Sequence, residues 1–190
     1  NLEIVVSPED DVEIRKLIFK NTGNKCRSIE VTSYMEVTLQ SFEGDTVHPS
    51  FSNLFISTEY IEDKKCIIGN RRPRASNSTV PYVFHKLVTN EKLEGNITYE
   101  TSRLNFIGRN RSLENPRALD NGMTLGNTVG TVLDPIMSIR GRIRLEPNEE
   151  KVLYYVTGTT KSREETIALV DKYSEVNKLE RCYYSYSKAV

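Results

Sequence analysis

Tryptophan is absent from this sequence of 190 residues, and histidine and cysteine are scarce, with two and three residues. His48 and His85 lie far apart and no Cys-x-x-Cys pair occurs, so the chain has almost nothing from which to build a zinc site. The three cysteines, Cys26, Cys66 and Cys182, are widely spaced and odd in number, which does not suit a disulfide framework. We therefore expect reduced, mostly structural thiols and a cytoplasmic location.

A surplus of positive charge is also missing, because 26 Lys and Arg side chains balance 26 Asp and Glu side chains. Nucleic-acid binding needs a basic surplus or stripe, so we expect no nucleic-acid partner. No apolar run approaches the ~20 residues that cross a bilayer. The chain opens with Asn1-Leu2-Glu3 and not with the basic and apolar regions of a signal peptide. No membrane contact is expected from this segment.

Side-chain combinations that catalyse reactions are equally scarce. Asp45 and His48 lie close together, but no Gly-x-Ser-x-Gly motif accompanies them, and a structural histidine in a turn is the simpler interpretation. His85 falls within a predicted strand, where a hydrogen-bonded structural histidine is expected. Glu30 and Glu36 share the exposed face of another strand, so no carboxylate pair suited to glycoside chemistry stands out. We predict no catalytic residue in this chain.

Alternating apolar residues predict a mainly β chain. The clearest pattern covers residues 29–39, where Ile29, Val31, Met35, Val37 and Leu39 share one face and only Ser33 interrupts it. Period-2 alternation of this length predicts one long antiparallel strand with a buried face. Further strands are expected at residues 2–6, 13–20, 54–61, 65–68, 80–88, 96–101 and 152–157.

One more strand is predicted from its outward-facing arginines. Its inward residues are Met137, Ile139, Ile143 and Leu145, and its outward residues are Arg140, Arg142 and Arg144. Between the strands, residues 45–51 are expected to form a polar connection. Residues 103–131 are punctuated by glycines, so we expect an irregular segment, of a length that usually indicates function or contacts.

The end of the chain changes from strand to helix. Ser162-Arg163-Glu164-Glu165 is a capping box, which predicts a helix start. The apolar helix face is expected to carry Ile167, Leu169, Val170, Tyr173 and Val176. A second helix is expected over residues 179–188, with tyrosines that pack against a neighbouring domain. The prediction is an antiparallel β-sandwich over residues 1–160 and helices over residues 161–190.

Arginine is the residue type that most suggests ligand binding. Arg71, Arg72 and Arg74 flank a proline, and Arg103, Arg109 and Arg111 lie in the glycine-punctuated segment. Guanidinium groups bind phosphates, carboxylates and sugar hydroxyls, whereas ion pairs or a solvated face are the alternative interpretation.

A specific arrangement is predicted for the second arginine group. Phe106 and Ile107 should anchor the segment in the sandwich and Gly108 should permit a bend. Arg109 and Arg111 should then project the same way from extended backbone, toward one ligand or one carboxylate cluster.

Several stretches of the chain share the order and spacing of one known family. They are residues 6–15 (VSPEDDVEIR), 30–37 (EVTSYMEV), 48–55 (HPSFSNLF), 71–74 (RRPR), 106–111 (FIGRNR), 130–136 (GTVLDPI) and 162–165 (SREE). The chain resembles the N-terminal β-domain of glycoside hydrolase family 94, formerly glycosyltransferase family 36. Within that family it is most similar to the branch of cyclic β-1,2-glucan synthases and 1,2-β-oligoglucan phosphorylases. Asn110 departs from the pattern, which favours a small residue such as glycine at this position.

The resemblance implies a β-supersandwich of the galactose-mutarotase-like type, followed by linker helices and an (α/α)6 barrel. It implies an inverting phosphorylase or glycosyltransferase as the parent enzyme. In such enzymes a barrel acid protonates the leaving oxygen while inorganic phosphate attacks the anomeric carbon. This chain matches the sandwich and the linker helices. The resemblance thus places the catalytic acid and the main phosphate-binding residues in the barrel, and additional sandwich strands ahead of the matched segment.

Two functions remain open from the sequence. The first is a non-catalytic, carbohydrate-binding β-domain that shapes a cleft for a β-glucan oligosaccharide, with candidate binding residues Arg109, Arg111, Arg103, Arg72 and Arg74. The second is a purely structural module that docks onto the (α/α)6 barrel and the remaining sandwich and supports a homodimer. No metal or cofactor is expected, and inorganic phosphate or glucose 1-phosphate is implied only as co-substrate of the parent enzyme.

Overall fold

The computed structural model describes residues 1–73 and 80–189, and its strands form two antiparallel sheets. The large sheet has seven strands in the order β1 (Leu2–Val6), β2 (Val12–Lys20), β11 (Glu150–Thr160), β7 (Tyr82–Val88), β6 (Cys66–Arg71), β5 (Ile56–Ile61) and β9 (Gly130–Thr131). In the small sheet, β10 (Pro135–Leu145) pairs with β3 (Arg27–Thr32), β4 (Met35–Glu36) and β8 (Thr98–Ser102). The predicted mainly β, antiparallel sandwich is confirmed.

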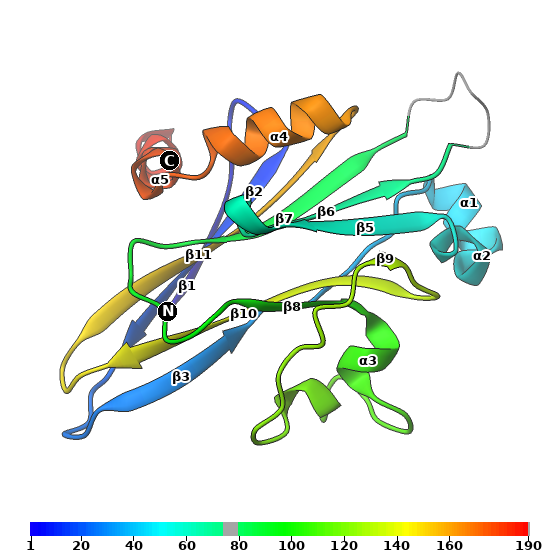
Figure 1. Ribbon diagram of the computed structural model, residues 1–190. Helices are drawn as coiled ribbons and strands as arrows, with labels where there is room; N and C mark the ends of the chain where they lie inside the picture. The colour runs from blue at the N-terminus through cyan, green and yellow to red at the C-terminus, as the bar shows by residue number, and fades with distance from the viewer. Residues whose placement is uncertain (74–79, 190) are drawn as a thin grey trace.

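The large sheet is covered on both faces. One face packs against the small sheet, and the other lies under α4 (Arg163–Lys172) and α5 (Val176–Ala189), as Figure 1 shows. On β11, Leu153 and Tyr155 belong to the core between the sheets, whereas Tyr154 and Val156 belong to the core beneath the helices. Burial on both faces explains why this strand reads as a nearly continuous apolar run.

The long strand predicted over residues 29–39 is interrupted at Ser33 and Tyr34. The Ser33 hydroxyl accepts a hydrogen bond from the Ile139 amide at 3.0 Å, and the Ser33 carbonyl accepts one from the Ser138 hydroxyl at 2.6 Å. These side-chain bonds replace ladder bonds, while β3 and β4 keep a single register against β10. The pattern therefore predicted the buried face correctly and the continuity of the strand wrongly.

The expected polar connection at residues 45–51 is instead part of two short helices, α1 (Phe42–Val47) and α2 (Pro49–Asn53). Ser41 caps α1 by accepting from the Gly44 amide, and a proline occupies the first position of α2, where its missing N–H costs nothing. A third short helix, α3 (Arg103–Ile107), begins the segment expected to be irregular and is capped by Ser102.

The capping box at the start of α4 forms with one of its two hydrogen bonds changed. The Ser162 hydroxyl accepts from the Glu165 amide at 3.1 Å, as predicted, but the Glu165 carboxylate accepts from the Lys161 amide and not from Ser162. Helix α5 begins at Val176, earlier than expected. In the described part of the chain, no helix combines the length and the apolar character needed to cross a bilayer.

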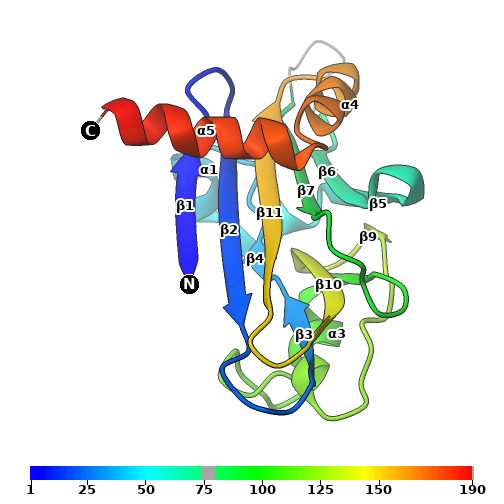
Figure 2. The same cartoon turned by 90° about the vertical axis from the view of Figure 1, so that its left-hand side faces the viewer.

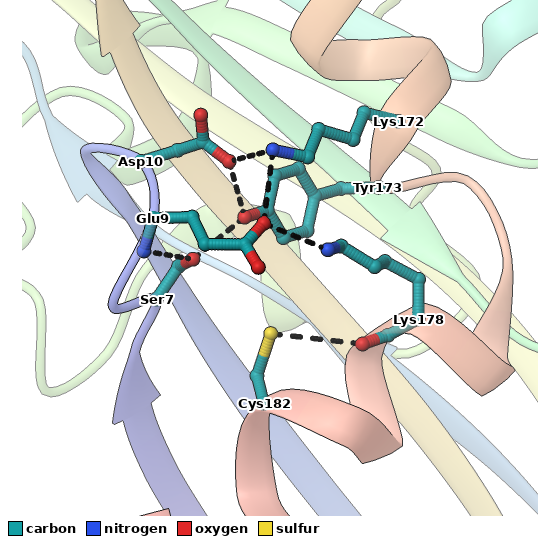
Figure 3. Close-up of polar contacts among 7 residues, drawn as sticks. All are labelled: Ser7, Glu9, Asp10, Lys172, Tyr173, Lys178 and Cys182. Atoms are coloured by element: carbon teal, nitrogen blue, oxygen red, sulfur yellow. Dashed lines mark hydrogen bonds and ion pairs between the residues drawn. The ribbon is translucent and has the colours of Figure 1, made fainter. Parts of the chain in front are cut away.

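A polar clamp holds the turn between β1 and β2 against the junction of α4 and α5 (Figure 3). Its residues are Ser7, Glu9, Asp10, Lys172, Tyr173, Lys178 and Cys182. The Ser7 hydroxyl lies 2.6 Å from the fully buried Tyr173 hydroxyl, which donates to Asp10 at 2.6 Å. Lys172 bridges Asp10 at 2.6 Å and Glu9 at 3.2 Å, and Lys178 contacts Glu9 at 3.0 Å.

Electrostatics in the clamp favour the charged carboxylates. Burial opposes ionisation of Asp10, but hydrogen bonds from Lys172 and Tyr173 outweigh it and lower the Asp10 pKa. The pKa of Glu9 is lowered chiefly by its hydrogen bond with Lys178. Burial, and then the bond to Asp10, raises the pKa of Tyr173 to about 12. The clamp is therefore complete at neutral pH and weakens as acid protonates its carboxylates.

Strand β1 is an open edge of the sandwich. Figure 2 shows β1 at the margin of the large sheet, with α5 crossing its end. Leu2, Ile4 and Val6 point toward the small-sheet side but remain 54%, 52% and 63% exposed, because the small sheet does not reach over them. Leu2 and Val6 line a groove of about 720 Å³ between the sheets. The outer edge of β1 pairs with no strand among residues 1–73 and 80–189.

We predict that the isolated chain self-associates through this edge, because an apolar unpaired strand invites pairing with another chain. Light scattering over a dilution series should give a mass above that of the 21.7 kDa monomer. Ile4→Lys should shift the population toward monomer, whereas Leu133→Lys, at an even more exposed apolar site away from β1, should not. A monomer that persists at every concentration would contradict the prediction.

We also predict that Tyr173→Phe lowers the free energy of unfolding by about 1–2 kcal/mol, because it removes a buried hydroxyl bonded to Ser7 and Asp10. The loss should be full at neutral pH and should shrink as the pH falls through the lowered pKa of Asp10. Urea denaturation at several pH values measures both effects. Tyr82→Phe is the control, since no bond of its hydroxyl occurs among the described contacts, and an equal loss there would refute the assignment.

Candidate functional site

The predicted binding arginines lie at one end of the sandwich. Arg103 begins α3, and Arg109 and Arg111 lie in the turn that follows it. Arg72 is exposed just beyond β6, and Arg74 falls outside the described residues. Helix α2 connects the two groups. Its Ser52 carbonyl accepts from Arg71, and the Asn53 side-chain Nδ2 donates to Asp134, a partner of Arg103.

Arg71 was expected in the same loop as Arg72 and Arg74, but it is the last residue of β6 and is buried. Its Nη1 donates to the Ser52 carbonyl at 2.7 Å, and its guanidinium lies 5.3 Å from the centre of the Phe55 ring. Arg71 therefore fixes α2 to the large sheet and contributes to structure at this end of the sandwich.

Arg103 is held by carboxylates of its own chain. Its Nε lies 3.1 Å from Glu36 and its Nη1 lies 3.6 Å from Asp134. Tyr34 donates to Glu36 at 2.8 Å and packs on Phe106 with ring centres 4.9 Å apart. Burial and the Glu36 bond raise the pKa of Tyr34 to about 12. The guanidinium is oriented, but it remains partly exposed.

The backbone after α3 turns where extended geometry was expected. Gly108 and Asn110 have φ angles of +87° and +59°, so Arg109 and Arg111 do not alternate along a strand. Arg111 bonds both oxygens of Asp120 at 2.8 Å, whereas Arg109 is exposed and makes no ion pair within the described part of the chain. Asparagine tolerates the left-handed conformation better than other non-glycine residues, which explains how Asn110 replaces glycine here.

The predicted anchors of this turn are confirmed. Phe106 and Ile107 are buried and form a small core with Ala118, Leu125 and Ile136. This core attaches the segment 103–126 to the outer face of the small sheet.

Arg140 was predicted to face solvent but is only 4% exposed. It does point away from the sandwich interior, as the alternation of β10 requires, but residues 117–123 fold over it. Its Nη1 donates to the Met123 carbonyl at 2.7 Å and its Nη2 donates to the Ala118 carbonyl. Glu30 lies 3.5 Å away and only partly offsets the effect of burial, which lowers the Arg140 pKa.

Glu100 is a second buried charge on this face that sequence reasoning missed. It lies on β8 opposite Ser138 of β10 and is 1% exposed. Its side chain borders a cavity of about 200 Å³ between α3 and the segment 117–126, which Asn105 and Arg117 also line. A glutamate in a polar strand pattern usually indicates a solvated face, so only the length of the irregular segment hinted that this face is covered.

The groove between the sheets contains His85, and the prediction of a structural histidine is confirmed. Its Nδ1 lies 2.8 Å from the Thr157 hydroxyl and its Nε2 lies 2.8 Å from the Ser33 hydroxyl. Its ring stacks parallel to Tyr155 at 5.4 Å. Burial lowers the pKa of His85 to about 3, so the imidazole is neutral at physiological pH and serves to join the two sheets.

Comparison with known proteins identifies a family for this chain. The family model for the supersandwich domain of glycosyl hydrolase 94 matches residues 1–176. The cyclic β-(1,2)-glucan synthase NdvB of Rhizobium meliloti is 35% identical over 172 residues, which are 90% of this chain and 6% of that protein. A polysaccharide lyase of solved structure shares 11% identity and a TM-score of 0.48 over 89% of this chain and 21% of its own.

The chain thus spans a small fraction of the length of the curated relative that it matches. The match to the supersandwich model covers both sheets and helix α4 and ends at the first residue of α5. The chain therefore belongs to the glycosyl hydrolase 94 family, as a supersandwich domain.

Proposed function

We propose that this chain is a non-catalytic, carbohydrate-binding domain of a larger enzyme that acts on β-glucans, in which it forms one side of the substrate cleft. The observation that carries the proposal is the arginine-bearing surface of the segment 103–126, which packs over the outer face of the small sheet of a family 94 supersandwich. Exposed Leu104, Leu113 and Leu119 lie on the same segment. The 35% identity to a cyclic β-(1,2)-glucan synthase supports a β-1,2-glucan as the ligand class.

The chemistry of this surface suits neutral sugars. Sugar hydroxyls both donate and accept hydrogen bonds, so a binding surface needs donors and acceptors together. Arg103 and Arg111 are fixed in place by Glu36 and Asp120, and each pair presents a guanidinium beside a carboxylate. Arg109 adds an exposed guanidinium in the same turn.

The bond-breaking step belongs to other parts of the parent enzyme in this proposal. Both ring nitrogens of His85 are engaged by hydroxyls and its pKa is about 3, which removes it as a general acid. Glu36 and Asp134 both contact the Arg103 guanidinium, so these carboxyl groups hold an arginine in place in this chain.

A second candidate function is docking, and exposed apolar side chains favour it. Leu2, Ile4 and Val6 on β1 are exposed. Four more exposed apolar side chains lie on α1, on α2 and just after α2, namely Phe42, Val47, Phe51 and Leu54. Apolar surface of this kind marks contact with other protein. In this alternative the domain holds the barrel and a homodimer mate without contacting sugar.

Calorimetry of the isolated chain with β-1,2-linked gluco-oligosaccharides separates the two functions. We expect binding of these oligosaccharides and not of α-linked ones of equal length. We also expect no phosphate release from glucose 1-phosphate with a glucose acceptor, because the proposal assigns the acid to the barrel. Absence of binding would favour docking, and phosphate release above a blank would contradict the non-catalytic assignment.

Arg109→Ala and Arg111→Ala test the surface within the full-length enzyme. Loss of a charge-assisted hydrogen bond should reduce oligosaccharide turnover by about tenfold. The melting temperature should change little, because solvent screens the exposed Arg111–Asp120 pair and exposed ion pairs add little to stability. Arg144→Ala, which breaks a comparable exposed pair with Glu146, is the control. A fall in melting temperature or dimer dissociation with unchanged turnover would assign the arginines to docking instead.

A further inference from the structure

Glu100 is a buried carboxylate whose hydrogen-bond partners are all neutral. Its Oε1 accepts from the backbone amides of Thr101 at 3.0 Å and Ser102 at 2.9 Å, and its Oε2 accepts from the Thr128 hydroxyl at 3.2 Å. Within residues 1–73 and 80–189, no lysine, arginine or histidine forms an ion pair with it. A carboxylate oxygen can accept two hydrogen bonds, so Oε2 retains acceptor capacity in a place where desolvation is costly.

The space beside Oε2 is kept open. Glu100 lines the cavity of about 200 Å³ together with Asn105, Phe106, Arg117, Leu125 and Gly126. A Cβ atom at Gly126 would lie 2.8 Å from Oε2, closer than van der Waals contact allows. Glycine at this position is therefore what leaves the carboxylate oxygen accessible to the cavity.

The walls of the cavity are held in position before any ligand arrives. The Arg140 guanidinium binds the carbonyls of Ala118 and Met123, both of which line the cavity. Phe106 and Leu125 are buried in the core beneath the segment. A preformed cavity lowers the ordering cost of binding.

The mixture of charges selects the chemistry of the ligand. Arg117 at the cavity and Arg140 beneath it disfavour a cation, whereas the Glu100 carboxylate disfavours an anion. Asn105 and Arg117 supply donors and Glu100 supplies an acceptor above an apolar floor. These groups suit a neutral ring that carries several hydroxyls, and the cavity volume suits one ring and not a chain of rings.

We propose that this cavity is a subsite for a single hexopyranosyl unit of a glucan, with Glu100 accepting from one sugar hydroxyl and Asn105 and Arg117 donating to others. The assignment rests on the proposed carbohydrate-binding function and adds to it a location distinct from Arg109 and Arg111. It also gives Glu100 the polar partner that its described contacts leave room for.

Amide NMR of the 190-residue chain, titrated with a β-1,2-linked glucose disaccharide to millimolar concentration, tests the subsite. We expect chemical-shift changes that concentrate in residues 100–106 and 117–128. Arg117→Ala should weaken binding about tenfold, as expected for one charge-assisted hydrogen bond. Gly126→Ala should weaken it at least as much by filling the space beside Oε2. Arg144→Ala should leave the affinity unchanged.

The outcomes distinguish the subsite from the broader function. Disaccharide binding that perturbs other residues and is unaffected by Arg117→Ala and Gly126→Ala would overturn the subsite and leave the carbohydrate-binding function standing. Absence of any binding by the native chain would overturn both. The spectrum of Gly126→Ala without sugar must match the native spectrum outside residues 98–130, which shows that the fold is intact. If the two spectra differ there, Arg117→Ala, at an exposed position, decides the result.

Discussion

The structure depends on burying both faces of the large sheet, and β11 is where this requirement is strictest. This strand pairs along its length with β2 on one side and β7 on the other, and its consecutive side chains enter two different cores. A sheet that is apolar on both faces must be covered twice. The small sheet covers one face, and α4 and α5 cover the other. The seven-stranded sheet is wider than its four-stranded cover, and the exposed side chains of β1 follow from that mismatch.

Local patterns predicted the elements that this constraint governs directly. Alternation placed Met137, Ile139, Ile143 and Leu145 inside, and all four are fully buried. The sequence also predicts the capping serine of α4 and the anchors Phe106 and Ile107, since each depends on neighbours within a few residues. The break at Ser33 was not, because it depends on hydrogen bonds with β10 more than 100 residues away. The short helices α1 and α2 are too short and too polar to give a periodic apolar pattern, so the sequence predicts only a polar connection there.

The sequence predicted which arginines lie at the candidate site but not which carboxylates bind them. Sequence singled out Arg103, Arg109 and Arg111 because guanidinium groups bind oxygen-rich ligands, yet Glu36, Asp134 and Asp120 already occupy two of them. The same limitation hid Arg140 and Glu100. Both alternate correctly toward the outside of the small sheet, and only the folding of residues 103–126 over that face turns an outside position into a buried one. Burial of a strand's outer face by a distant irregular segment leaves no local signal.

The two outer faces of the molecule are organised by separate polar clusters. Figure 1 shows α4 and α5 on one side and the segment around α3 on the opposite side, with both sheets between them. The clamp around Tyr173 joins the helices to the large sheet, whereas Arg140 and Glu100 organise the cavity on the small sheet. The two clusters share no residue and no hydrogen bond, so free-energy changes from substitutions in one should add to those in the other. That separation means that the bonds that fix the helical junction do not involve the residues that line the cavity on the opposite face.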